Sequence, residues 1–382
     1  MINEERLLLE FKTLLSIESP SKREGEIAYY LADLFEALGY PCFFDKSGEH
    51  TGSEVGNLIV KIPGKKEVPP LLLCAHLDTV GPCEGIEVIE EEDLLRSNGK
   101  TILGADDKAG IAVLVELAKA LKENSFSHAP LEIVFTTCEE IGLLGAKNLD
   151  FKHINAKWAL VLDSENPEEV VNAAPSSYQF SVKVFGKSAH AGIEPEKGIN
   201  AIKILAQIVS SLPTGRIDYE TTMNIGKING GVYVNVVPDF AFIEGEMRSH
   251  SEEKLNSLKS EVEDKVREII ENHPHKIDTL PSYKINFTTV FKAFHIEEED
   301  PLARMIREAG YLAGLEVKFK KKEGGSDANV FNAQGIKTLI LGTGMQKVHT
   351  TEEFIRKKDL FNCARLVSTA VKLYSERAKE FF

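Results

Sequence analysis

Acidic and histidine side chains stand at the ends of apolar segments in this sequence. His76 and Asp78 follow the apolar run 71–75, and residues two apart in an extended chain point to the same side. An imidazole can bind a metal ion, and a nearby carboxylate fixes its tautomer and raises its basicity. A strand that simply ends in ordinary polar residues would show the same sequence pattern. The pair therefore predicts a metal ligand and its orienting partner only if the rest of the chain completes the site.

Further acids end apolar segments in the same way, and they are Asp106, Glu139, Glu140 and Asp163. A loop after the apolar run 338–342 adds His349. Taken singly, each has a plain alternative. Asp106 could be a helix N-cap, the two glutamates a solvated helix start, and His349 a surface histidine. Together, two histidines and the carboxylates form a nitrogen and oxygen set without thiolate. Such a set suits two Zn²⁺ ions, or Mn²⁺ or Co²⁺, better than a structural cysteine-rich zinc site.

This set of residues predicts hydrolysis. Two divalent ions ~3.5–4 Å apart can activate a water and polarise a carbonyl. A nearby carboxylate must then take the proton and pass it to the leaving nitrogen. Of the two adjacent glutamates, one can bind metal while Glu139 stays free to move the proton. Cys74 and Cys138 neighbour these residues in sequence, but strand alternation turns them away, so we expect them in the core.

The elements that must position these residues indicate an α/β fold. Helical and strand patterns alternate in 1–173 and return in 292–382, which favours a mixed, mainly parallel sheet with helices on both faces. Residues 174–291 instead follow the order βαββαβ, which is typical of a ferredoxin-like α+β domain. We therefore expect a catalytic domain made of 1–173 and 292–382, with 174–291 inserted as a dimerisation or lid domain. Expected helices cover 4–16, 22–38, 109–122, 198–212, 252–272 and 301–313, and expected strands cover 57–62, 71–75, 131–137, 159–163, 178–185, 221–228, 240–248, 283–291 and 338–341.

The composition argues against several other functions. The chain of 382 residues carries 45 basic and 59 acidic residues, a net charge of −14, which disfavours a nucleic-acid or anionic-membrane partner. Its apolar stretches fall short of the ~20 residues that span a bilayer, so we expect no membrane insertion. The five cysteines are odd in number and form no CxxC pair, which predicts reduced thiols and a cytoplasmic location.

Four motifs, in this order, resemble those of the M20 family of di-zinc metallopeptidases, most closely its peptidase T (tripeptide aminopeptidase) branch. They are His-Leu-Asp-Thr-Val at 76–80, Leu-Gly-Ala-Asp-Asp-Lys-Ala-Gly at 103–110, Glu-Glu-Ile-Gly at 139–142 and Gly-Lys-Ser-Ala-His-Ala-Gly at 186–192. The similarity spans nearly the whole chain, including the inserted domain. Residues 138–145 and 228–231 match the broader M20 pattern that deacylases and carboxypeptidases share, whereas 103–110 favours peptidase T.

The resemblance implies roles for the candidate residues. One zinc ion would be bound by His76, Asp106 and Asp163, and the other by Asp106, Glu140 and His349. Asp106 would then bridge the two ions. Asp78 would orient His76, and Glu139 would be the general acid and base.

The inserted domain would add residues that contact the substrate. By the same resemblance, His190 would reach the site of a second subunit and stabilise the oxyanion, which implies a homodimer. Asn235 and Arg248 match positions that grip a substrate carboxylate, a task that suits the planar guanidinium, although a surface arginine on a strand is the plain alternative. The family's substrate-lining loop corresponds to Gly324, Gly325 and Ser326.

The leading hypothesis is a cytoplasmic di-zinc aminopeptidase that releases the N-terminal residue of short peptides, above all tripeptides. An M20-type N-acyl-amino-acid deacylase or carboxypeptidase is the alternative within the hydrolases. A non-catalytic peptide-binding module on the same fold is a remote third reading, because every expected catalytic position is filled.

Overall fold

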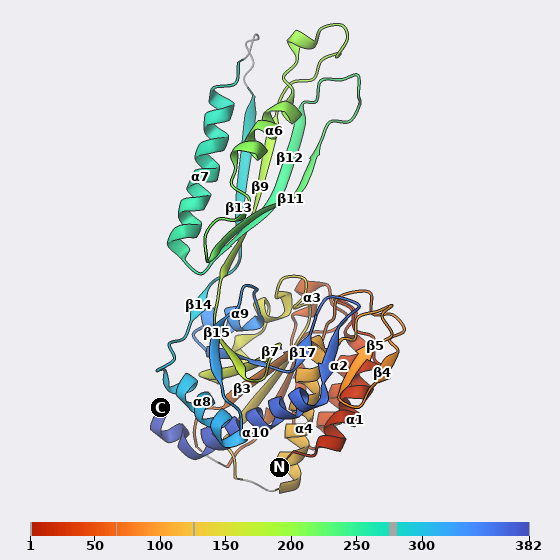
Figure 1. Cartoon of the computed structure of the whole chain (residues 1–382), viewed down its shortest axis with the longest axis vertical. Coiled ribbons are helices and arrows are strands. Elements are labelled where there is room, and N and C mark those ends of the chain that lie inside the picture. The colour runs from red at the N-terminus through yellow and green to blue at the C-terminus, as the bar shows by residue number, and fades with distance from the viewer. Residues whose placement is uncertain (1, 66, 125–126, 275–280, 382) are drawn as a thin grey trace. The chain divides into compact units, whose positions relative to one another are not determined.

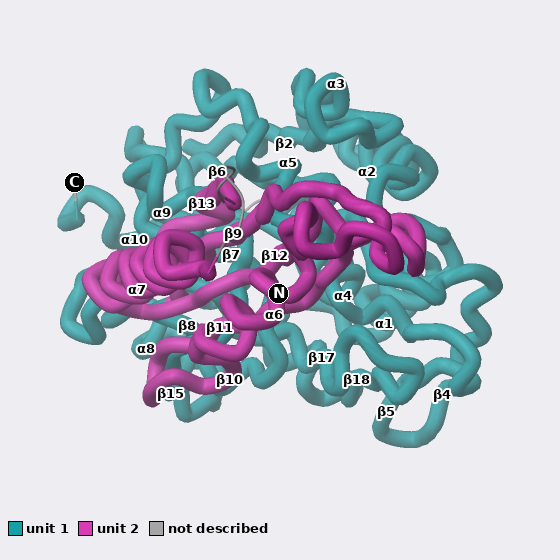
Figure 2. The backbone as a smooth tube through the Cα atoms, turned by 90° about the horizontal axis from the view of Figure 1, so that it is seen from above, with its two compact units in different colours: residues 1–173, 295–382 teal, residues 174–294 magenta. Residues whose placement is uncertain are grey.

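The chain divides into two compact units (Figures 1 and 2). Unit 1 comprises Met1–Ala173 and His295–Phe382, and unit 2 comprises Ala174–Phe294. The computed structural model describes residues 2–65, 67–124, 127–274 and 281–381. The second boundary lies slightly beyond the expected residue 291, because the chain rejoins the sheet of unit 1 only at β14 (Phe294–His295).

A mixed sheet forms the centre of unit 1, in the strand order β1-β2-β6-β3-β7-β16-β8-β14, with β15 beside β8. β3 pairs in parallel with β6 and with β7, and β16 pairs in parallel with β7. β3, β6 and β7 are buried along their whole length, as expected of parallel strands that are covered on both faces. The predicted α/β class is confirmed. The strands are β1 (Cys42–Phe44), β2 (Leu58–Ile62), β3 (Leu71–His76), β6 (Leu131–Thr136), β7 (Trp158–Ser164), β8 (Glu169–Ala174), β15 (Lys318–Lys321) and β16 (Lys337–Gly342).

Two groups of helices pack around this sheet (Figure 1). The first group surrounds α4 (Ala105–Asn124), which contacts β3 and β7 and is buried almost all round. Gly110 allows this close approach, since a Cβ there would lie 2.7 Å from the carbonyl oxygen of Leu162 in β7. The other members of this group are α1 (Glu4–Leu15), α8 (Pro301–Ala313) and α10 (Lys357–Phe381). The second group comprises α2 (Gly25–Ala37), α3 (Gly48–Thr51), α5 (Leu144–Lys147), the 3₁₀ turn Phe151–His153 and α9 (Asp327–Ala333).

A small antiparallel sheet in unit 1 was not expected from the sequence. Its order is β17-β18-β5-β4, with β17 (Met345–Gln346), β18 (Phe354–Arg356), β5 (Leu94–Ser97) and β4 (Val88–Glu90). These strands are too short to show an apolar alternation that stands out in the sequence. The loop of the β17–β18 hairpin carries His349, a candidate metal ligand.

Unit 2 is the predicted ferredoxin-like α+β domain. Its sheet has the order β10-β11-β12-β9-β13, and α6 and α7 pack on one face over a core that includes Val182, Ile243 and Leu255. α7 buries Leu255, Leu258, Val262, Val266 and Ile270, at the three- and four-residue spacing of an amphipathic helix. The elements are β9 (Ser176–Phe185), the 3₁₀ turn Pro195–Lys197, α6 (Ala201–Ser211), β10 (Gly215–Arg216), β11 (Thr221–Gly230), β12 (Phe240–Ser249), α7 (Glu252–Glu271) and β13 (Ser282–Phe291).

Among the residues that the structure describes, no helix is both long and apolar enough to cross a membrane.

Candidate metal centre

The parallel strands of unit 1 bring distant acids and histidines to one edge of the sheet. His76 is the last residue of β3, and Asp163 lies next to the end of β7. Glu139 and Glu140 follow the end of β6 directly, and Asp106 lies in the first turn of α4. Because neighbouring parallel strands share their carboxyl edge, sites in such sheets form there. The apolar strands therefore position these polar residues.

Asp106 lies between the two histidines. Its Oδ1 is 3.0 Å from His76 Nε2, and its Oδ2 is 3.2 Å from His349 Nε2. His349 Nε2 is also 3.0 Å from Glu140 Oε1. Ligand atoms of His76, Asp106 and Glu140 all lie within 4.8 Å of one another. The two oxygens of one carboxylate thus face two imidazoles that come from segments far apart in the sequence.

Asp163 is buried at the same edge beside a lysine that the sequence did not single out. Lys322 Nζ donates a hydrogen bond to the Asp163 carbonyl oxygen at 2.9 Å and lies 3.6 Å from Asp163 Oδ2. Burial raises the pKa of the Asp163 carboxyl group. Although burial opposes it, attraction to Asp163, Asp106 and Glu139 raises the pKa of Lys322, which keeps the lysine charged.

The remaining pKa shifts reflect an accumulation of acids around two imidazoles. Hydrogen bonds from His349 and His76 lower the pKa of Asp106, against the opposing effect of its burial. Hydrogen bonds to Asp106 and Glu140 raise the pKa of His349 to about 10. Burial is the main cause that raises the pKa of both Glu139 and Glu140. The carboxylates outnumber the positive charges that face them.

This donor set fits divalent cations. Asp106, Asp163, Glu139 and Glu140 converge at one edge, and Lys322 is the lysine that contacts them among the described residues. Several carboxylates held together out of water are costly unless positive charge compensates them. Oxygen and imidazole donors without thiolate suit Zn²⁺, Mn²⁺ or Co²⁺. Two imidazoles on opposite oxygens of Asp106 give that carboxylate the geometry of a bridging ligand.

Asp78 contacts both His76 and the turn that carries the two glutamates. His76 Nδ1 lies 2.8 Å from the backbone carbonyl oxygen of Asp78 and 3.6 Å from its Oδ1. The Asp78 carboxylate accepts hydrogen bonds from the backbone N–H groups of Glu139, at 2.8 Å, and Glu140, at 3.2 Å, and from Ser21 Oγ, at 2.6 Å. The carboxylate thus holds the turn, while the carbonyl oxygen of the same residue meets the imidazole.

A second buried acid, Glu24, holds the same turn at Cys138. Its Oε1 accepts the backbone N–H of Cys138 at 3.0 Å, and its Oε2 accepts Ser53 Oγ at 2.6 Å. Cys138 has a positive φ of 53°, a conformation that costs energy outside glycine and persists where its surroundings fix it. Sequence reasoning missed Glu24, because nothing in its own segment marks it as a partner of residue 138.

The predicted substrate-lining loop also lies in unit 1. Gly324 and Gly325 are half-buried, and Ser326 is fully buried immediately before α9. The Ser326 backbone N–H donates to Asn329 Oδ1 at 3.1 Å. This loop begins two residues after Lys322, which links it to the acidic edge.

Two predicted substrate residues lie on adjoining loops of unit 2. His190 and Val236 form an isolated bridge, and the Ala191 N–H donates to the Asn235 carbonyl oxygen at 2.9 Å. The loops of His190 and Asn235 are therefore joined by backbone hydrogen bonds, and both residues are exposed. Ile193 and Val234, beside them, are 71% and 104% exposed, so this end of unit 2 presents apolar as well as polar side chains.

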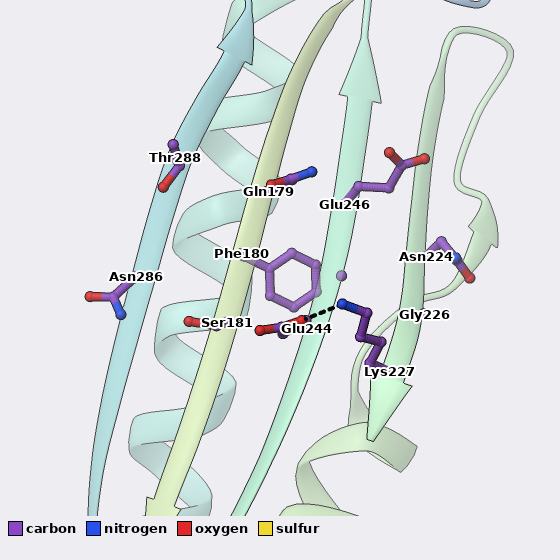
Figure 3. Close-up of a pocket in the computed structure, with 11 residues that line it drawn as sticks. Gln179, Phe180, Ser181, Asn224, Gly226, Lys227, Glu244, Glu246, Asn286 and Thr288 are labelled. Carbon is purple, nitrogen blue, oxygen red and sulfur yellow. Dashed lines mark hydrogen bonds and ion pairs between the residues drawn. The ribbon is translucent and has the colours of Figure 1, made fainter. Parts of the chain in front are cut away.

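Arg248 stands on the face of the unit 2 sheet that the helices leave open. Its Nη2 lies 3.0 Å from Oε2 of Glu246, and Glu246 lines a concavity of about 380 Å³ (Figure 3). Gly245 beside it makes room for the ring of the buried Phe180, since a Cβ there would lie 2.5 Å from that ring. Glu246 pairs with Arg248, and the other acid that lines the concavity, Glu244, pairs with Lys227 at 3.1 Å. The concavity is thus a charge-balanced polar surface and lacks the imidazole and carboxylate set of unit 1.

Comparisons with known proteins agree with this geometry. The model of the M20 peptidase dimerisation domain matches residues 172–274, and that of peptidase family M28 matches residues 57–191. The uncharacterized protein YqjE of Bacillus subtilis is 37% identical over 380 residues, 99% of this chain and 100% of YqjE. Aminopeptidase PepT of Bacillus cereus is 36% identical, with a TM-score of 0.88 over 97% of this chain and 99% of PepT. A tripeptidase of Staphylococcus aureus is 33% identical, with a TM-score of 0.89 over 98% of this chain and 100% of the tripeptidase.

Together with these matches, the mainly parallel α/β unit and the inserted ferredoxin-like unit identify the chain as a peptidase. The chain belongs to the M20 family of peptidases, in its peptidase T branch, and is an enzyme of the aminopeptidase type. The family predicted from the sequence motifs is confirmed.

Proposed function

We propose that this enzyme is a di-zinc aminopeptidase that hydrolyses the N-terminal peptide bond of tripeptides. The observation that carries the proposal is the position of Asp106 between His76 and His349, with one carboxylate oxygen toward each imidazole. A single carboxylate in that position can be shared by two cations. The names of the relatives, an aminopeptidase PepT and a tripeptidase, support the choice of substrate.

The proposed ligands form two overlapping groups. The first group is His76, Asp106 and Asp163, and the second is Asp106, Glu140 and His349. Metal ions bound there would activate a water molecule and polarise the scissile carbonyl. Binding requires neutral imidazoles and ionised carboxylates, so the protonated state that the acids favour in His349 must be given up when a cation enters.

Glu139 is the proposed general acid and base. Its backbone is fixed by Asp78 on one side, and Cys138 before it is fixed by Glu24 on the other. This support holds the Glu139 side chain at the edge where the ligands converge. Glu139 would accept the proton of the attacking water and deliver it to the leaving amine, a role that typically contributes about 10²–10⁴-fold in rate.

Further residues are proposed to contact the substrate. Arg248 and Asn235 would bind the substrate carboxylate, and His190 would stabilise the oxyanion in the site of a second subunit. Arg248 Nε is buried and has no hydrogen-bond partner among the described residues, so a carboxylate ligand would satisfy it. Gly324, Gly325 and Ser326 would line the peptide, because small residues let backbone groups come close to it.

A length series of peptides with free and blocked termini tests this function. We expect cleavage of free tripeptides in the presence of Zn²⁺, Mn²⁺ or Co²⁺, release of the N-terminal residue, and rejection of the N-acetylated tripeptide. Glu139→Gln should lower kcat by about 10²–10⁴-fold with unchanged metal content. Equal cleavage of the blocked peptide, or release of its C-terminal residue, would instead identify a deacylase or a carboxypeptidase. Metal-loaded protein that cleaves no peptide would contradict the proposal.

The chain would act as a homodimer. Its match to the peptidase dimerisation domain supports this, as do the exposed apolar residues Ile202 of α6 and Ile228 of β11, which are 41% and 62% exposed. Sedimentation analysis should give twice the 42.3 kDa mass of the chain. A cytoplasmic location is proposed on the same terms, supported by five cysteines that are all unpaired.

A further inference from the structure

Glu353 is a buried carboxylate close to the proposed metal ligands, yet it belongs to neither ligand group. Its side chain is fully buried. Its Oε2 accepts hydrogen bonds from the backbone N–H groups of Leu103, at 2.7 Å, and Gly104, at 2.8 Å. Its Oε1 accepts the backbone N–H of Asp106 at 3.1 Å. One side chain thus satisfies three N–H groups of the turn that leads into α4.

This carboxylate joins two segments that each bring a proposed ligand. Glu353 ends the loop of the β17–β18 hairpin, in which His349 has a positive φ of 62°. The turn at the other end of the contact carries Asp106, and its Gly104 has a positive φ of 81°. Glu353 and Leu103 are 250 positions apart in the sequence. The contact therefore fixes the irregular loop of His349 against the irregular turn of Asp106.

A further contact limits how this loop can move. Ser97 Oγ, at the end of β5, donates to the Thr351 carbonyl oxygen at 3.3 Å, and β18 pairs with β5 immediately after Glu353. These contacts anchor the hairpin to the small sheet but do not reach the Asp106 turn. Among the hydrogen bonds of the described residues, only that of the Glu353 carboxylate joins this loop to the backbone of Asp106.

We propose that Glu353 is a positioning residue for the metal centre, which holds Asp106 and His349 at the spacing that a shared cation requires. The inference rests on the proposed function, because it assumes that both residues bind metal. A carboxylate that only accepted three backbone hydrogen bonds would affect the stability of the fold alone. A positioning carboxylate must also affect metal affinity, and must do so through His349 and Asp106. Partners of metal ligands typically contribute about 10–100-fold in metal affinity.

The test compares Glu353→Gln with Glu352→Gln in the full-length protein. Glu352 is the adjacent residue of the same loop, is exposed, and pairs with Lys347, so its variant is a matched control for the loss of one negative charge. The amide of Glu353→Gln keeps one acceptor and turns an NH₂ group toward a backbone donor. Zn²⁺ dissociation constants are measured by competition with a chromophoric chelator, and Co²⁺ absorption spectra report the coordination. We expect about 10–100-fold weaker metal binding and an altered Co²⁺ spectrum for Glu353→Gln, and wild-type values for Glu352→Gln.

A double-mutant cycle with His349→Ala separates positioning from general stability. If Glu353 acts by placing His349, the effect of Glu353→Gln on metal affinity should shrink by at least about fivefold when His349 is already absent. Equal effects in both backgrounds would overturn this inference but leave the proposed function standing. Wild-type metal affinity of a folded Glu353→Gln protein would do the same. If Glu353→Gln does not fold, the same cycle with Glu353→Asp decides in the same way. Wild-type protein that binds no metal would contradict the proposed function itself.

Discussion

Asp78→Asn distinguishes two ways in which Asp78 could serve the site. The Asp78 carboxylate accepts three donors, the N–H groups of Glu139 and Glu140 and the hydroxyl of Ser21. An asparagine offers one acceptor oxygen, so its NH₂ group must face at least one of these donors. His76 keeps its contact at 2.8 Å, because that contact is made to the Asp78 backbone carbonyl oxygen. We therefore expect the variant to disturb the turn of Glu139 more than the imidazole of His76.

The magnitude follows from the hydrogen bonds that change. A hydrogen bond to a charged group contributes about 1.5–3 kcal/mol, and a buried donor left unpaired costs about 1–3 kcal/mol. Relief from burying the Asp78 charge offsets part of that sum. We expect the free energy of unfolding of the metal-free protein to fall by about 3 kcal/mol. A displaced Glu139 should lower kcat by about 10–100-fold.

The assay combines urea unfolding, tripeptide kinetics and Zn²⁺ competition on the same preparations. Ser21→Ala is the control, because it removes the one donor that is not on the glutamate turn, and it should leave kcat near the wild-type value. The expected signature of Asp78→Asn is a large loss in kcat with Zn²⁺ affinity changed less than about tenfold. Loss of Zn²⁺ affinity that accounts for all of the lost activity would refute this reasoning and would favour action through His76.

Four more outcomes are expected. Glu24→Gln should lower kcat by about tenfold at unchanged metal content, whereas the exposed Glu26→Gln should match the wild type in the same peptide assay. His76→Ala should lose metal and activity together, as measured by metal analysis and turnover, while the fold seen by circular dichroism persists. Chelation should lower Tm in calorimetry, because a ligand at 1,000 times its Kd stabilises the native state by about 4 kcal/mol. Burial lowers the pKa of Lys108 to about 8 from 10.5, so the unfolded chain holds this proton more tightly between these pH values. In urea titrations of the metal-free protein, the unfolding free energy of the wild type should therefore gain about 3 kcal/mol relative to that of Lys108→Met from pH 8 to 10.5. The raised pKa of His349 acts in the opposite direction in both proteins and cancels in this difference.

The sequence predicted the parts of the site that lie at the ends of long apolar strands. β3, β6 and β7 are continuous buried runs, so their ends could be recognised and His76 and Asp163 assigned to one edge. β17 and β18 are too short to give such a signal, so His349 was found as a loop histidine without its hairpin. The arrangement of the short strands depends on tertiary pairing, which a local pattern does not encode.

The sequence could not predict which atoms the supporting carboxylates would meet. The carboxylate of Asp78 was expected to orient His76, whereas in the structure the backbone oxygen of Asp78 lies closer to the imidazole, at 2.8 Å against 3.6 Å for the carboxylate. Glu24 and Glu353 bond backbone N–H groups that are 114 and 250 positions away. Backbone donors carry no residue type, so no motif marks such a contact. Lys322 was missed for a related reason, since its partner Asp163 lies on another strand.

The buried acids around the centre can be sorted by the partners that they already have. Glu24, Asp78 and Glu353 each accept backbone N–H groups, and so does Asp107, which accepts the N–H groups of His76 and Gly110. Backbone donors offset part of the cost of burying these carboxylates without a metal, while burial still raises the pKa of Glu353 to about 7 and raises that of Asp107.

The acids that face imidazoles or one another are a different group, and they are Asp106, Glu140 and Asp163. For these, a bound cation would supply the compensation that backbone donors give to the first group, because buried carboxylates otherwise repel one another. From hydrogen bonding and charge we infer the same division between proposed ligands and supports that the family motifs imply. This division predicts that, in metal-loaded protein, Asp78 and Glu353 keep their hydrogen bonds from backbone N–H groups and ligate no metal ion.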